Sequence, residues 1–138
     1  MKPATDVQII DVDGLSTSPL SAAQVLRGVI YTSGLVGRDP VDGRLSDTFE
    51  EQMQAAMANL QRVLTAAGGS LHTVIKTTVF LTRREDFAAM NALYATYFPE
   101  AKPARSTIIT GLADPRLRFE IEAIAYKRGE DTGKEEVR

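Results

Sequence analysis

The clearest pattern in the chain is an apolar stripe at helical spacing between residues 49 and 67. Its members fall at i, i+4, i+7, i+8, i+11, i+14, i+15 and i+18, and they are Phe49, Met53, Ala56, Met57, Leu60, Val63, Leu64 and Ala67. Thr48 and Glu51 have the spacing of a capping box, and Gly68-Gly69 provides a left-handed stop. The pattern therefore predicts an amphipathic helix with one face in the core.

Short β-branched and aromatic runs surround this helix and predict strands. These runs are Val7 to Asp11, Ala23 to Leu26, Val29 to Ser33, Val74 to Leu81, Arg105 to Thr110 and Leu117 to Tyr126. A second amphipathic helix is predicted from about Arg84 to Phe98, where Pro99 ends it. The element order βββαβαββ predicts an α+β fold, in which two helices cover one face of a mixed sheet.

The domain is expected to end near residue 126. The last twelve residues, KRGEDTGKEEVR, carry four basic and four acidic groups and one aliphatic residue. Such a segment buries too little apolar surface to order itself. We therefore predict a single domain over residues 1–126 and a charged, disordered tail over residues 127–138.

Alternation along the last strand separates an apolar face from a polar one. The apolar series is Leu117, Phe119, Ile121, Ala123 and Ala125, and the other series is Arg118, Glu120, Glu122, Ile124 and Tyr126. Helices are expected on the apolar face, which leaves the glutamates on the uncovered one. On the preceding strand, Arg105, Thr107 and Ile109 share a face. If the two strands are neighbours, Arg105 and Glu120 lie together on the uncovered face.

That mixed face has two interpretations. Ile109, Ile124 and Tyr126 beside arginine and glutamate suit a subunit interface that contains a polar pocket. The same residues also suit a solvent-exposed face with a surface ion pair worth at most about 1 kcal/mol. Alternation alone does not choose between them.

The amino-acid composition argues against several kinds of functional site. The chain has no cysteine, which excludes disulfides, thiolate nucleophiles and cysteine metal sites. Its single histidine, His72, cannot form a histidine cluster and is expected in an exposed turn, so no metal site is predicted. A net charge of −2 argues against a broad nucleic-acid surface. No apolar run is long enough for a membrane helix, and we expect a cytoplasmic protein.

Four segments, in order and with matching spacing, resemble those of a known family. They are Lys102 to Thr107 (KPARST), Phe119 to Ala125 (FEIEAIA), Val74 to Leu81 with Asp86-Phe87 and Asn91, and Ile30 to Gly34 (IYTSG). The resemblance covers about residues 18 to 126. The family is RidA/YjgF, formerly labelled the translation inhibitor or L-PSP endoribonuclease family.

This resemblance implies a chorismate-mutase-like fold and a homotrimer, in which three sheets form a central barrel and ligands bind in clefts between subunits. It also implies hydrolytic deamination of reactive enamines and imines, such as 2-aminoacrylate and 2-iminopropionate. The products would be 2-keto acids and ammonia, formed without a cofactor or a metal.

The resemblance also implies roles for individual residues. Arg105 would grip a substrate carboxylate through two parallel hydrogen bonds, and Glu120 would position or deprotonate the attacking water. Backbone groups at Ser33, Gly34 and Thr107 would orient the remaining polar atoms. A matching helix residue, Asn91, is either part of the pocket or a buried structural polar group.

The sequence departs from the family's pattern near the expected pocket. The family's tyrosine and glutamine are here Leu20 and Ala22, and Leu35 replaces another amide. We therefore expect a more apolar substrate-binding pocket at Leu20, suited to a bulkier or less polar substrate. An alternative function is a non-catalytic trimer that binds or senses small carboxylates or acts as a chaperone. A third is breakdown of aminoacrylate-type or aminomuconate-type compounds.

Overall fold

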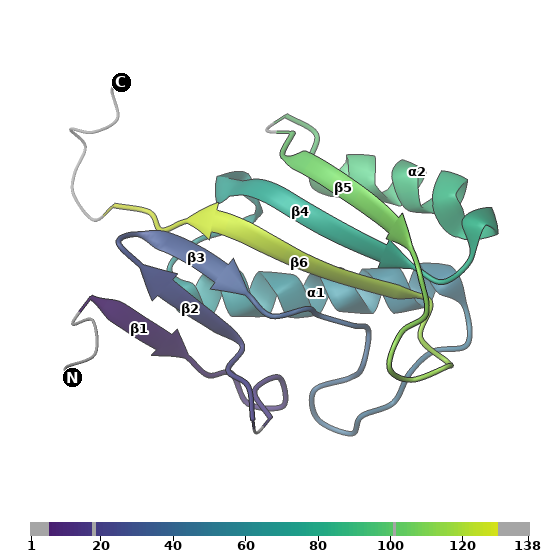
Figure 1. Ribbon diagram of the computed structural model, residues 1–138, viewed down its shortest axis with the longest axis horizontal. Helices are drawn as coiled ribbons and strands as arrows, with labels where there is room; N and C mark the ends of the chain where they lie inside the picture. Colours follow the sequence, from purple (N-terminus) through teal and green to yellow (C-terminus); the bar gives the residue numbers. More distant parts are fainter. Residues whose placement is uncertain (1–5, 18, 101, 130–138) are drawn as a thin grey trace.

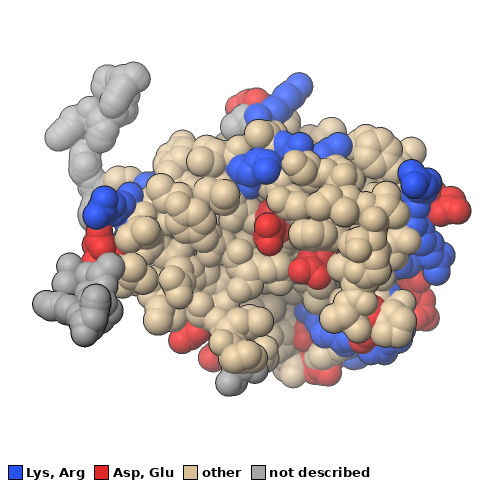
Figure 2. Space-filling model, in the orientation of Figure 1, with Lys and Arg blue, Asp and Glu red and all other residues tan. Residues whose placement is uncertain are grey.

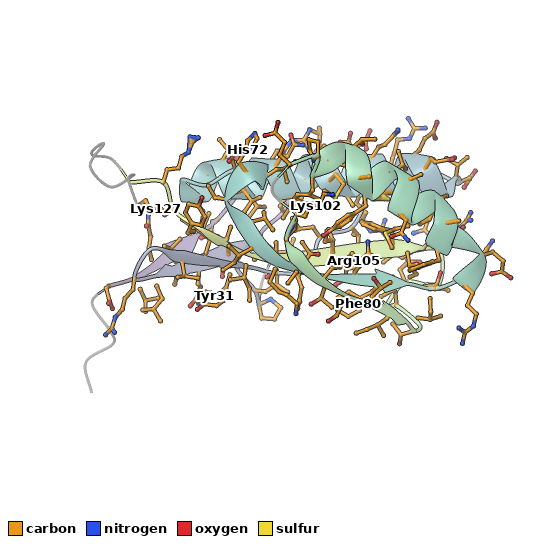
Figure 3. The ribbon with its side chains drawn as sticks, turned by 90° about the horizontal axis from the view of Figure 1, so that it is seen from above. Tyr31, His72, Phe80, Lys102, Arg105 and Lys127 are labelled. Carbon is orange, nitrogen blue, oxygen red and sulfur yellow. The ribbon has the colours of Figure 1, made fainter. Side chains whose placement is uncertain are left out.

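The computed structural model describes residues 6–17, 19–100 and 102–129 and contains one sheet with two helices on one side of it (Figures 1 and 3). The strands are β1 (Val7–Ile10), β2 (Ala23–Leu26), β3 (Val29–Thr32), β4 (Val74–Leu81), β5 (Ala104–Ile109) and β6 (Phe119–Tyr126). The helices are α1 (Phe49–Ala67) and α2 (Phe87–Tyr97), with short 3-10 turns at Leu71–Thr73 and Arg84–Asp86. The predicted βββαβαββ order and the single helical layer are confirmed.

Helix α1 begins and ends where its sequence predicts. The Thr48 hydroxyl accepts a hydrogen bond from the Glu51 amide, and Gly68 ends the helix at a φ of 92°, a left-handed value that suits glycine. The Glu51 carboxylate accepts from the Ser46 hydroxyl instead of closing a full capping box. The whole predicted stripe from Phe49 to Ala67 is buried, so this helix forms one side of the core.

Polar side chains on the buried side of α1 fix the loops that lead into the site. The Asn59 side-chain amide donates to the carbonyls of Val36 and Arg38, each at 2.9 Å. This satisfies the backbone of the segment that follows β3, where a loop would otherwise bury unpaired carbonyls. The path of the chain just after Gly34 is therefore held by the core helix.

Strand β6 lies in the sheet between β3 and β4 and packs under the helices. Its apolar series, from Phe119 to Ala125, is buried, while Glu122 and Tyr126 are exposed on the other face, as predicted. Arg118 precedes the strand and does not follow its alternation. Its guanidinium instead pairs with Asp86 at 2.7 Å and lies 5.7 Å from the Phe49 ring, on the helical side.

The prediction that Arg105 and Glu120 share the uncovered face is wrong. The sheet order is β1-β2-β3-β6-β4-β5, so β4 lies between β5 and β6. Register places Arg105 and Ala123 level with Thr77, and Ile108 and Glu120 level with Phe80. Residues that are level across adjacent strands share a face. Arg105 therefore lies on the helical face with Ala123, and Glu120 lies on the open face.

The same register corrects the expected position of Ile109. It lies level with Leu81 and Phe119, and thus on the helical side of the edge strand β5. Ile124 and Tyr126 keep their predicted place on the open face, since they pair with Tyr31 and Val29 of β3.

The chain beyond β6 remains attached to the domain for two residues. The Lys127 amide donates to the Gly28 carbonyl at 2.7 Å, and the Arg128 amide donates to the Gly68 carbonyl at 2.9 Å. The predicted tail therefore cannot begin at residue 127. Residues 130–138, to which the rest of that prediction applies, lie outside the described residues.

Two expectations about the surface have different outcomes. His72 is exposed in the 3-10 turn before β4, as predicted. No helix within residues 6–17, 19–100 and 102–129 is long and apolar enough to cross a membrane. The cytoplasmic location stays a prediction.

Candidate active site

Arg105 stands near the start of the edge strand β5, and its partly buried side chain is directed toward α2 (Figure 3). The guanidinium carbon lies 4.8 Å from the ring centroid of Tyr94 and 6.0 Å from that of Phe87. One guanidinium nitrogen lies 3.7 Å from the Met90 sulfur. Within the described part of the chain, no carboxylate forms an ion pair with it. Apart from the weak contact of one nitrogen with the Met90 sulfur, its N–H donors have no side-chain partner among the described residues and can bind an incoming anion.

The side chains that surround Arg105 come from the apolar stripe of α2. They are Phe87, Met90 and Tyr94, and the sequence predicts the helix but not its contact with Arg105. The missing information was the sheet face on which Arg105 lies, because helical spacing does not contain it.

Asn91 belongs to the same helical face. It lies four residues after Phe87 and three before Tyr94, positions that are neighbours on a helix surface. The side chain is only partly buried, and its amide makes no hydrogen bond within residues 6–17, 19–100 and 102–129. The choice between a pocket residue and a structural polar group therefore stays a prediction for Asn91.

Thr107 follows Arg105 on the same face of β5. Its hydroxyl oxygen is buried and has no hydrogen-bond partner among the described residues. The Thr110 amide donates to the Leu81 carbonyl of β4 at 2.9 Å. Because successive amides of a strand point in opposite directions, the amides of Thr107 and Arg105 point away from β4, toward the outer edge. This edge thus presents backbone donors beside the guanidinium.

Glu120 is held on the open face against a glycine. The Leu35 amide donates to the Ile121 carbonyl at 2.7 Å, and the return bond measures 3.0 Å, which brings the segment after β3 alongside β6. A Cβ atom on Gly34 would lie only 1.9 Å from a carboxylate oxygen of Glu120. The carboxylate therefore needs glycine at position 34.

The open face changes the acidity of Glu120. Burial raises the pKa of its carboxyl above the ordinary value, and the negative charge of Glu122, on the same face of β6, raises it further. Figure 2 shows acidic side chains within a broad uncharged surface on this side of the molecule. Such a carboxyl holds a proton more readily than a solvated one, which suits it to proton exchange.

Leu20 and Ser33 line a shallow groove next to Gly34. The groove has a volume of about 450 Å³, and Tyr31 and Gln24 form another part of its wall. The Ser33 hydroxyl donates to the Ser21 carbonyl at 2.7 Å, so it fixes the Leu20 loop rather than facing a ligand. Leu20 itself is 50% exposed.

Only one of the three apolar replacements lies at a surface. Ala22 is fully buried and Leu35 is 4% exposed, both within the core. They cannot make a pocket of this chain more apolar, contrary to expectation. The prediction of a more apolar pocket therefore depends on Leu20 alone.

The candidate residues thus form two groups that do not meet within one chain. The first, which we call the arginine group, is Arg105, Thr107 and Asn91, and the second, the glutamate group, is Glu120, Gly34, Ser33 and Leu20. Two strand spacings and three residues of rise separate Arg105 from Glu120, or about 14 Å, and the side chains leave opposite faces. A small imino acid is a few bond lengths long and cannot span them.

The fold is that of a small α+β protein, and the edge of its sheet carries an arginine that has no carboxylate partner among the described residues. The family model described as Endoribonuclease L-PSP matches residues 14–127. The chain belongs to this family, the RidA/YjgF family, which confirms the resemblance in its sequence.

Individual relatives match most of the chain. It is 41% identical over 110 residues to the 2-iminobutanoate/2-iminopropanoate deaminase of Mus musculus, which covers 79% of this chain and 82% of that protein. RidA from an Antarctic Psychrobacter gives a TM-score of 0.81 at 33% identity, covering 86% of this chain and 98% of that one. The structure of Escherichia coli TdcF with bound serine gives a TM-score of 0.80 at 30% identity, and the match covers 88% of this chain and 99% of that one. These likenesses confirm the predicted fold.

Proposed function

We propose that this protein hydrolyses reactive enamines and imines of the 2-aminoacrylate and 2-iminopropionate type to 2-keto acids and ammonia. The observation that carries the proposal is the Arg105 guanidinium, partly buried and without a carboxylate partner among the described residues. Such a planar fork is suited to bidentate binding of a carboxylate. The 2-iminobutanoate/2-iminopropanoate deaminase that it resembles acts on compounds of this class by name.

The proposed reaction uses water and proton transfer. Arg105 holds the substrate carboxylate, with the outward amide and hydroxyl of Thr107 beside it. Glu120 accepts a proton from a water molecule as the water oxygen attacks the carbon of the protonated imine, which gives a neutral tetrahedral carbinolamine. Glu120 passes that proton to nitrogen, the carbon–nitrogen bond breaks, and ammonia leaves. Glu120 then takes the remaining hydroxyl proton as the carbonyl forms, and releases it to ammonia or water. An enamine first takes a proton at its terminal carbon to become the imine.

We propose further that a site is completed by a second copy of the chain in a homotrimer. The edge of β5 and α2 of one subunit would meet the Gly34 and Glu120 region of its neighbour, which unites the two groups of residues. The open sheet face supports this arrangement, because it carries exposed apolar side chains, among them Ile9, Leu26, Tyr31, Ile108 and Tyr126. An extensive exposed apolar surface marks an interaction site, and three such faces would close into the central barrel.

One observation favours the alternative, a non-catalytic trimer that binds small carboxylates. Leu20 is exposed beside Gly34 and has no group that transfers a proton, and the Ser33 hydroxyl is bonded to the Ser21 carbonyl. In this alternative Arg105 still binds the carboxylate, but Glu120 is the one proton-transferring side chain of the site and does not suffice for turnover.

Release of ammonia and 2-keto acid from freshly generated 2-aminoacrylate distinguishes the two functions. The wild-type protein should accelerate release above the rate in buffer, and Arg105→Ala should return it to the buffer rate. Arg44→Ala is the matched control, because it removes an exposed arginine whose side chain forms no ion pair within the described residues. Equal rates with and without wild-type protein, together with calorimetric binding of pyruvate, would establish the binder.

A further inference from the structure

Arg105 is held differently from the other arginines that the structure places in contacts. Arg118 pairs with Asp86 at 2.7 Å, and Arg116 pairs with Asp114 at 2.9 Å. Arg105 instead rests on aromatic faces, 4.8 Å from the Tyr94 ring centroid. An aromatic face attracts a cation through its quadrupole and accepts no strong hydrogen bond from it. This support orients the guanidinium and leaves its charge and donors for a ligand.

The Tyr94 ring is itself fixed at its far end. Its hydroxyl forms a buried 2.7 Å hydrogen bond with the hydroxyl of Thr77, which is fully buried on β4. Thr77 is the residue level with Arg105 in the parallel pair of β4 and β5. The strand residue beside Arg105 therefore anchors the ring that supports Arg105.

Packing around Tyr94 restricts the ring further. It is only 9% exposed, and the Phe98 ring lies 4.8 Å away at an interplanar angle of 44°. Burial also raises the pKa of the Tyr94 hydroxyl, so the phenol stays neutral and does not become a counter-ion for Arg105.

We infer that Tyr94 and Thr77 are positioning residues that aim the Arg105 guanidinium at the ligand carboxylate and keep it without a counter-ion. Tyr94 supplies the supporting face, and Thr77 locks the plane of that face through the shared hydrogen bond. The inference rests on the proposed function, because it takes Arg105 to be the carboxylate receptor.

Three substitutions separate the parts of this device. Tyr94→Phe removes the hydroxyl and keeps the ring, Thr77→Val removes the other hydroxyl at nearly constant shape, and Tyr94→Leu removes the ring. We expect Tyr94→Leu to raise the dissociation constant for pyruvate, and KM for the imine, by about tenfold with kcat changed far less. The two hydroxyl deletions should each have a smaller effect of about threefold. Because they break the same bond, the double variant should be no worse than either single one.

The decisive measurement places Tyr94→Leu in an Arg105→Ala background. If Tyr94 acts through Arg105, the second substitution changes pyruvate affinity no further, whereas a general structural defect lowers it again. Tyr97→Leu is the matched control on the same helix, since Tyr97 is partly buried and the rings next to Arg105 are those of Phe87 and Tyr94. It should lower the melting temperature without raising KM.

The outcomes separate this inference from the proposed function. If Arg105→Ala changes neither pyruvate affinity nor turnover, the proposed site is wrong. If Arg105→Ala matters but Tyr94→Phe, Thr77→Val and Tyr94→Leu bind pyruvate as tightly as wild type, only the positioning role is overturned. Should Tyr94→Leu fail to fold, the two hydroxyl variants and their double variant still decide.

Discussion

The arginine group and the glutamate group create opposite electrostatic environments. Around Arg105 the protein supplies the rings of Tyr94 and Phe87 and no carboxylate partner within its described residues, which favours a fixed, available positive charge. Around Glu120 it supplies partial burial and a second carboxylate, Glu122, which make negative charge unfavourable and proton uptake easier. In the proposed function, binding and proton transfer therefore belong to different surfaces. Each environment can be tuned without disturbing the other, provided that a second chain brings them together.

Removal of the charge from the arginine group should have the largest effect. Arg105→Ala deletes both hydrogen bonds to the substrate carboxylate, and charge-assisted bonds are worth about 1.5–3 kcal/mol each. We expect kcat/KM to fall by about a thousandfold, measured as keto-acid release. Arg105→Lys should recover part of it, since the charge returns without the planar fork. Activity within twofold of wild type in Arg105→Ala would contradict the assigned role.

Mixing of variants tests whether the two groups act across subunits. Arg105→Ala and Glu120→Gln should each be inactive alone. If each site takes Arg105 from one chain and Glu120 from the next, random reassembly of the two variants restores about one site in four. Activity should rise from background to about a quarter of wild type after co-expression. No recovery, although mass spectrometry shows mixed trimers, would place both residues of a site in one chain and contradict the shared site.

Substitution of Gly34 should displace the glutamate group without unfolding the protein. An alanine Cβ would lie 1.9 Å from the Glu120 Oε2 atom, and this atom is the movable end of a side chain. The carboxylate can therefore swing away while the backbone stays in place. We expect Gly34→Ala to lower kcat by roughly tenfold, with little change in pyruvate affinity, because Arg105 is untouched.

Gly111→Ala is the control for this prediction. A Cβ at Gly111 meets nothing within 4 Å, so the same added methyl group should leave kcat unchanged. A loss of pyruvate binding in Gly34→Ala equal to its loss of kcat would show that the two groups are not separate in function.

The sequence predicts the elements of this fold well and their mutual placement less well. The helix from Phe49 to Ala67 and the strand from Val74 to Leu81 end at the predicted residues, because caps and β-branched runs are local signals. Alternation also identified the buried face of β6. It did not locate Arg105, because the insertion of β4 between β5 and β6 is a nonlocal choice. Alternation shows which residues of one strand share a face. Without the order of the strands, it does not show which face of the sheet that is.

The same limit explains what was missed in the candidate site. The segments KPARST and FEIEAIA named Arg105 and Glu120, but no pattern in them shows that Tyr94 and Thr77 support the guanidinium. Ala22 and Leu35 were expected near a pocket because they replace amide side chains of the family's pattern, yet both side chains enter the core. Contacts of this kind are set by register between strands and helix, which requires coordinates.

The smallest expected effect tests whether the charge of Glu122 raises the pKa of Glu120. Glu122→Gln removes the like charge that raises the Glu120 pKa, so this pKa should fall toward its ordinary value. If the ionised carboxylate accepts the proton from water, kcat/KM rises with pH as Glu120 ionises. The acidic limb of the profile should therefore move to lower pH in Glu122→Gln. Glu100→Gln, the same charge change at an exposed site after α2, should leave it in place.

The raised pKa of Glu120 should also make the free energy of unfolding depend on pH. A carboxyl whose folded pKa lies above its unfolded one holds its proton more tightly in the folded state, so its contribution is complete below the unfolded pKa. That contribution is lost as pH rises through the folded pKa. Between these two pKa values, chemical denaturation should show a smaller loss of unfolding free energy for Glu122→Gln than for wild type. In Glu120→Gln, this carboxyl should contribute no loss. An acidic limb that stays fixed in Glu122→Gln, or moves upward, would contradict the coupling of the two carboxylates.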